Sequence, residues 1–176
     1  MKTVAFCRTK KIKGKEYAYI VENIWKHKSS RQKVKDYLGR AYRFELKNDV
    51  DFQQFVKTDD IKNYIESSDN SKILNDLIGW ELFKFNIDKN KFSINLSNKK
   101  IQKNGKNVAL LINEGFLCGI TLKNLLEFEI SDEHTDTYKF ARAFVEAGIK
   151  VPHEVFVGLF GKLYKPIEKQ KSDFTW

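Results

Sequence analysis

The first 47 residues hold most of the side chains whose types and spacing suggest a chemical task. This segment contains 14 lysines and arginines against 4 acidic residues, whereas the other 129 residues contain 18 basic and 19 acidic ones. Cations gathered on one surface displace the counterions that condense on a polyanion, and aromatic rings set among them stack on unpaired bases. The segment therefore predicts a surface that binds the phosphate backbone of a nucleic acid.

The candidate nucleic-acid-binding residues are the cations and aromatic rings between residues 10 and 43. Stacking contributes about 1–3 kcal/mol per base, which is comparable with several surface charges. The alternative is a solvated strand face whose lysines maintain solubility and discourage pairing at the sheet edge. The residues that we expect to contact nucleic acid are Lys10, Lys11, Lys13, Lys15, Tyr17, Tyr19, Trp25, Lys26, Lys28, Arg31, Lys33, Lys35, Tyr37, Arg40 and Arg43.

Three predicted strands position these side chains. Residues 15–25 (KEYAYIVENIW) are rich in aromatic and β-branched residues with a period of two, which is typical of a strand. Gly14 supplies the turn before them, and residues 3–9 form the antiparallel partner. Residues 31–38, between a polar turn and Gly39, form the third strand. An antiparallel sheet of this kind can leave one face in water.

Alternation along the strands predicts which side chains share the outward face, because successive residues point to opposite sides. This expectation requires regular pairing, since a bulge would move side chains to the other face. The sets expected to face outward are Tyr17, Tyr19, Val21 and Trp25 on the second strand, and Arg31, Lys33, Lys35 and Tyr37 on the third.

The overall pattern predicts an α+β fold in two domains. Residues 1–47 form the N-terminal three-stranded antiparallel sheet, which is the basic nucleic-acid-binding module. Residues 48–176 form a mostly helical remainder with one β-hairpin, built from residues 81–87 and 91–96. The polar stretch 97–107 is expected to be a linker, and the apolar run from Val108 to be helical or buried. Two last helices are separated by Gly148 and Pro152.

Catalytic and metal-binding patterns are absent from the sequence. The acids around His134 fit a helix start, where negative charge favours the helix dipole, better than a magnesium site. The chain has no phosphate-binding loop of the form GxxxxGK[ST], no GxGxxG and no GxSxG. Cys7 and Cys118 each lie within an apolar stretch, as buried structural cysteines do. We predict a protein that is not an enzyme and needs no cofactor and no metal.

The stretch from Lys11 to Arg40 resembles the N-terminal β-region of DDE-type insertion-sequence transposases and of small uncharacterised archaeal proteins. The resemblance depends on a glycine-containing turn, a tyrosine-rich strand with a short basic loop, an Arg-Gln-Lys run at residues 31–33 and a Tyr-Leu-Gly-Arg run at residues 37–40. Residues 112–130 and 140–156 also resemble uncharacterised archaeal proteins. The resemblance implies a DNA-contacting sheet. Transposition itself is not expected, because the chain is too short for the ribonuclease-H-like catalytic core.

Nucleic acid is the expected partner, and double-stranded DNA is favoured because of this resemblance. One alternative is an RNA-binding or ribosome-associated factor, since stacked rings suit unpaired bases. Another is a protein-interaction adaptor whose helical half binds a protein while the basic segment acts as a tether. A membrane is not expected, because no run approaches the roughly 18 apolar residues that a spanning helix needs. The N-terminus lacks a signal-peptide pattern, so we expect a cytoplasmic, nucleic-acid-associated protein.

Overall fold

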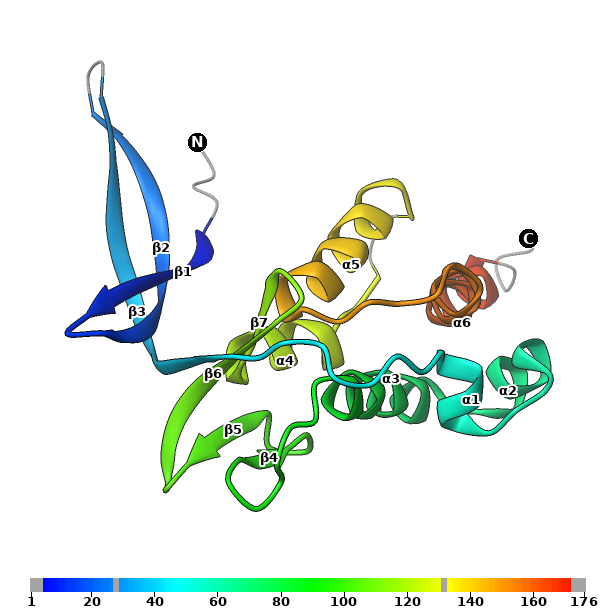
Figure 1. Cartoon of the computed structure of the whole chain (residues 1–176). Helices are drawn as coiled ribbons and strands as arrows, with labels where there is room; N and C mark the ends of the chain where they lie inside the picture. The colour runs from blue at the N-terminus through cyan, green and yellow to red at the C-terminus, as the bar shows by residue number, and fades with distance from the viewer. Residues whose placement is uncertain (1–4, 27–28, 131–132, 172–176) are drawn as a thin grey trace.

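Strands from distant parts of the sequence join into one seven-stranded mixed sheet with helices beside it (Figure 1). The structure is a computed structural model that describes residues 5–26, 29–130 and 133–171. The strands are β1 (Ala5–Ile12), β2 (Lys15–Lys26), β3 (Ser29–Arg43), β4 (Ser93–Asn95), β5 (Lys100–Lys103), β6 (Lys106–Ile112) and β7 (Gly115–Leu117). The helices are α1 (Phe52–Val56), α2 (Ile61–Ser67), α3 (Asn70–Lys84), α4 (Gly119–Leu126), α5 (Glu133–Ala147) and α6 (His153–Lys171).

The predicted fold class is wrong, because the sheet does not end with the three N-terminal strands. The strand order is β1-β2-β3-β6-β5-β4, and β7 pairs with β6. Strand β3 runs parallel to β6, with Arg40 opposite Val108 and Arg43 opposite Leu111. The run from Val108 to Ile112 is buried, which explains its unbroken apolar sequence. A continuous apolar run does not by itself separate a buried strand from a buried helix.

A second correction concerns the polar stretch before β6, which was expected to be a linker. Asn104 and Gly105 have φ angles of 52° and 72° and connect β5 to β6. Positive φ at both central residues is what a two-residue type I′ hairpin turn requires, and Asn-Gly is its strongest sequence signal. The expected hairpin of residues 81–87 and 91–96 is also wrong, because Glu81–Lys84 end helix α3. Residues 93–95 form β4, which pairs with β5 instead.

The β2–β3 hairpin extends beyond the rest of the sheet. Among the described residues, strand β1 pairs with residues 15–22 of β2, and the pairing of β2 with β3 continues beyond them to Lys26 and Ser29. Figure 1 shows it projecting away from the helices. Gly39 lies where the hairpin meets the body: its φ is +102°, and a Cβ atom there would overlap the carbonyl group of Asn107 in β6. Only glycine allows this close approach of two backbones.

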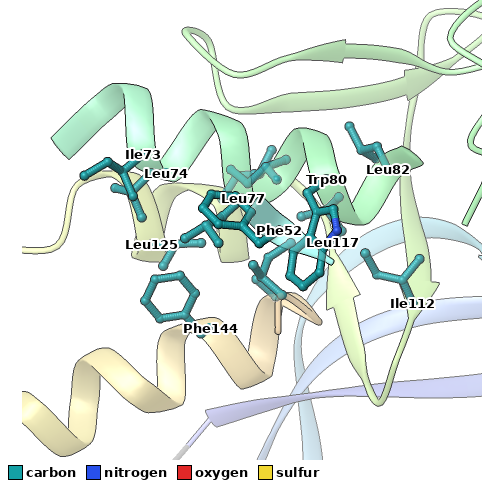
Figure 2. Packing of buried hydrophobic residues seen from close by; sticks show 14 of the residues in the cluster. Phe52, Ile73, Leu74, Leu77, Trp80, Leu82, Ile112, Leu117, Leu125 and Phe144 are labelled. Carbon is teal, nitrogen blue, oxygen red and sulfur yellow. The ribbon is translucent and has the colours of Figure 1, made fainter. Parts of the chain in front are cut away.

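The main hydrophobic core lies between helix α3 and strands β6 and β7, and helices α4 and α5 close it (Figure 2). Leu77 of α3 belongs to one buried cluster with Ile112 and Leu117 of the sheet and with Leu125 and Phe144 of α4 and α5. Burial of each such side chain stabilises the fold by about 1.5–3 kcal/mol. Among the described residues no helix is sufficiently long and apolar to cross a membrane.

A buried carboxylate, Glu81 of α3, connects three segments of this body. Its Oε1 accepts a hydrogen bond from the backbone N–H of Lys150 at 2.9 Å and forms an ion pair with Lys84 Nζ at 3.0 Å. Its Oε2 accepts from Asn113 Nδ2 at 3.1 Å, and the same amide group donates to the Gly148 carbonyl oxygen at 2.7 Å. Asn113 has φ of 50° in the β6–β7 turn. Glu81 therefore holds α3, that turn and the α5–α6 connection together.

We predict that Glu81→Ala destabilises the protein by about 3–5 kcal/mol, because it leaves the buried Lys84 ammonium without its counter-charge. Chemical denaturation measures the free energy of unfolding. The control is Glu114→Ala in the same turn, whose exposed side chain is expected to change stability by less than about 0.5 kcal/mol. A loss below about 1 kcal/mol for Glu81→Ala would contradict the connecting role.

Candidate nucleic-acid interface

Two irregularities in the β2–β3 pairing decide which side chains share a face. Ala18 lies opposite Gly39 and Tyr19 opposite Tyr37, so β3 has an extra residue at Leu38. Ile20 lies opposite Asp36 and Val21 opposite Val34, so β3 has a second extra residue at Lys35. Each extra residue shifts the alternation of β3 relative to β2 by one position.

We call the side of β1–β3 that carries Tyr17, Tyr19 and Tyr37 the tyrosine face. The ring centroid of Tyr37 lies 5.3 Å from that of Tyr19 and 6.4 Å from that of Tyr17, so the three rings form one cluster. Tyr37 is 53% exposed. The cluster therefore presents an aromatic surface to solvent.

Four cations surround this cluster on the tyrosine face. Arg8 lies opposite Tyr19, while Lys10 and Arg40 flank Tyr17 on either side. Lys15 lies two residues before Tyr17 in β2 and shares its side of the pleat. All four cationic side chains are exposed.

The acidic residues of the three strands lie on the opposite face. Glu22 forms an ion pair with Lys35 at 3.2 Å, and Glu16 forms one with Arg43 at 3.2 Å. Asp36 is the cross-strand neighbour of Ile20 and shares that side. The described residues of β1, β2 and β3 thus place cations without carboxylates on the tyrosine face, and mixed charges on the other.

The structure brings together only part of the predicted site. The predicted residues on the tyrosine face are Lys10, Lys15, Tyr17, Tyr19, Tyr37 and Arg40. The predicted residues on the opposite face are Lys11, Arg31, Lys33, Lys35 and Arg43, and Lys13 lies in the β1–β2 turn. The expectation that Arg31, Lys33 and Lys35 share a face with Tyr37 is wrong because of the bulges. Lys28 lies outside the described residues, as do the side chains of Trp25 and Lys26.

Several residues of the face were not among the predicted ones. Arg8 has the same alternation as Lys10 in β1, so the strand pattern could have identified it. Its Nη1 donates a hydrogen bond to Oε1 of Gln32 in β3. Lys103 of β5 lies with its Nζ 4.5 Å from the Tyr42 ring centroid, and Arg40 lies 4.8 Å from the same ring. The contribution of Lys103 depends on the order of the strands in the sheet, which no local pattern predicts.

The two cysteines, which are far apart in the sequence, lie near each other behind the tyrosine face. Cys7 of β1 shares the side of Ala18 and Ile20, and Cys118 precedes helix α4. A hydrogen bond from the Cys7 thiol, followed by backbone N–H groups of Thr121 and Ile120, lowers the pKa of Cys118 below its ordinary value. The same thiol contact, followed by burial, raises the pKa of Cys7. Both cysteines are free, and their contact connects β1 with the start of α4.

No protein-family model matches this chain, and no curated protein or solved structure matches it. The resemblance to transposase N-terminal regions therefore stays an expectation. Within the described residues, no group of three or more His, Cys, Asp or Glu side chains is arranged to hold a metal ion. The functional argument accordingly depends on the geometry and charge of the tyrosine face.

The titration of Tyr37 tests whether the rings are close. Partial burial raises the pKa of Tyr37 above its ordinary value of 10, and the phenolates of Tyr19 and Tyr17 raise it further by charge repulsion. We predict that Tyr19→Phe lowers the Tyr37 pKa part of the way towards 10. The ring and its burial remain in this variant, and only the phenolate charge is lost.

NMR of ring-labelled tyrosine, followed against pH, measures the Tyr37 pKa. Tyr138→Phe, which changes a phenol 73% exposed on α5, is the control and is expected to leave the Tyr37 pKa unaltered. An identical Tyr37 titration in the Tyr19→Phe variant would show that the two rings do not neighbour each other.

Proposed function

We propose that this protein binds nucleic acid without catalysis, and that the tyrosine face is the binding surface. The observation that carries the proposal is the separation of charge across the sheet. The tyrosine face combines three clustered rings with the cations Arg8, Lys10, Lys15 and Arg40, while the carboxylates of the same strands lie on the other side.

Both the cations and the rings of the tyrosine face favour nucleic acid as the ligand. Cations on a rigid sheet release counterions from the phosphate backbone, and each contact adds about 0.7–0.9 to the slope of log K against log salt concentration. Exposed rings add about 1–3 kcal/mol for each base that stacks on them. A solvated face serving only solubility has no need to exclude carboxylates or to cluster its tyrosines.

DNA is the favoured partner on the transposase resemblance, and RNA is the alternative. DNA and RNA have the same phosphate groups, so we propose the tyrosine face as the interface for either of them. In the adaptor alternative the helical half binds a protein. This alternative does not require any particular arrangement of rings and cations on the tyrosine face.

Two triple variants with equal loss of charge test this proposal. Lys10→Gln, Lys15→Gln and Arg40→Gln together remove three cations from the tyrosine face. Lys11→Gln, Arg31→Gln and Lys33→Gln together remove three exposed cations from the opposite face. We expect the first triple to reduce the salt slope of binding by about 2–3 and the second to reduce it by less than about 1.

Fluorescence anisotropy with a labelled oligonucleotide at several salt concentrations gives these slopes, and thermal denaturation confirms that both triple variants fold. Equal losses in the two variants would show that net charge alone attracts the polymer. A greater loss in the second triple would place the interface on the opposite face of these strands and contradict the proposal.

A further inference from the structure

The tyrosine face contains a hollow of about 420 Å³ beside the ring cluster. Its lining includes Arg8 and Lys10 from β1, Tyr19 and Val21 from β2, and Gln32 and Val34 from β3. An inference about this hollow depends on the proposed function, because it concerns the form of nucleic acid that the same face binds.

The bulge at Lys35 creates the hollow. If β3 continued in register from the Ile20–Asp36 pair, Lys35 would lie opposite Val21 and its long side chain would cover this position. The extra residue instead places Val34 opposite Val21, and Lys35 forms its ion pair with Glu22 on the other face. Bulges commonly re-aim side chains beside binding sites.

The walls of the hollow differ in chemistry. Val21 and Val34 provide an apolar floor: Val21 is buried, whereas Val34 is 56% exposed and open to a ligand. The ring of Tyr19 lies on one side. Arg8 and Gln32, joined by their hydrogen bond, form a polar edge, and Lys10 adds a cation from the neighbouring strand.

This polar edge offers mainly hydrogen-bond donors. A guanidinium has only donors, and the Gln32 carbonyl oxygen already accepts from Arg8, which leaves the Gln32 amide N–H groups for a ligand. Two adjacent acceptors complement such an edge. Guanine presents them as O6 and N7, whereas adenine presents a donor at N6 beside N7.

We propose that this hollow binds one unpaired base, with guanine preferred over adenine, so that the ligand is single-stranded nucleic acid. A base that is stacked and paired within a duplex cannot enter the hollow. The tyrosine cluster then stacks a neighbouring base, and Lys10, Lys15 and Arg40 contact the phosphates on either side.

Binding of five labelled oligonucleotides to the full chain tests this inference. The set consists of a thirteen-residue oligothymidylate with a central guanine, the same strand with a central adenine, each of these paired with its complement, and the oligouridylate RNA with a central guanine. We expect the single strand with guanine to bind at least about tenfold more tightly than its duplex, and at least about fivefold more tightly than the adenine strand. The RNA strand differs from the DNA strand in its sugar and in lacking the thymine methyl groups, so it tests these two changes together.

Gln32→Leu separates base recognition from phosphate binding. We expect this variant to bind the guanine and adenine strands within about twofold of each other while it retains its preference for single strands. Gln53→Leu, at an exposed position of α1, is the matched control and is expected to keep the guanine preference.

The outcomes distinguish the two proposals. Absence of binding to every oligonucleotide at low salt would overturn the proposed function itself. Binding with equal affinity for single strand and duplex, or for guanine and adenine, would overturn the base-binding hollow while nucleic-acid binding stands. An unchanged guanine preference in the Gln32→Leu variant would also overturn the proposal that the hollow binds a base.

Discussion

Strand β3 contains two more residues than β2 along their shared ladder, and this mismatch determines the surface chemistry of the N-terminal sheet. Because side chains alternate between faces, each extra residue reverses the face of everything beyond it. Tyr37 thereby joins Tyr19, and Val34 replaces a lysine opposite Val21. The carboxylates of Glu16 and Glu22 remain on the side where Arg43 and Lys35 neutralise them. A regular ladder would mix these charges.

The helical body holds this sheet in a fixed position. Gly39 lets β3 approach the backbone of β6 closely, and the parallel pairing that follows continues the sheet into the main core. Glu81 then ties α3 to the β6–β7 turn and to the α5–α6 connection. An interface held on a rigid sheet loses little conformational entropy when it binds, so more of the contact energy appears as affinity.

Local patterns predicted the three N-terminal strands and the two last helices, but not the sheet that joins them. The alternation around Tyr17 and the stop at Gly148, with φ of 72°, are local signals. Asn104-Gly105 is also a local signal, although the polar composition around it predicts a linker. The parallel β3–β6 pairing and the bulges depend on contacts between distant residues, and this is why only part of the predicted cationic set lies on the tyrosine face.

Photochemical cross-linking tests most directly whether the tyrosine face contacts nucleic acid. An oligonucleotide carrying 5-iodouracil is irradiated in complex with the protein, and the attached residues are identified by mass spectrometry. The account predicts attachment at Tyr17, Tyr19 or Tyr37, whose clustered rings lie among the cations of this face. Attachment confined to the helical body, for example at the exposed Tyr138 of α5, would contradict it.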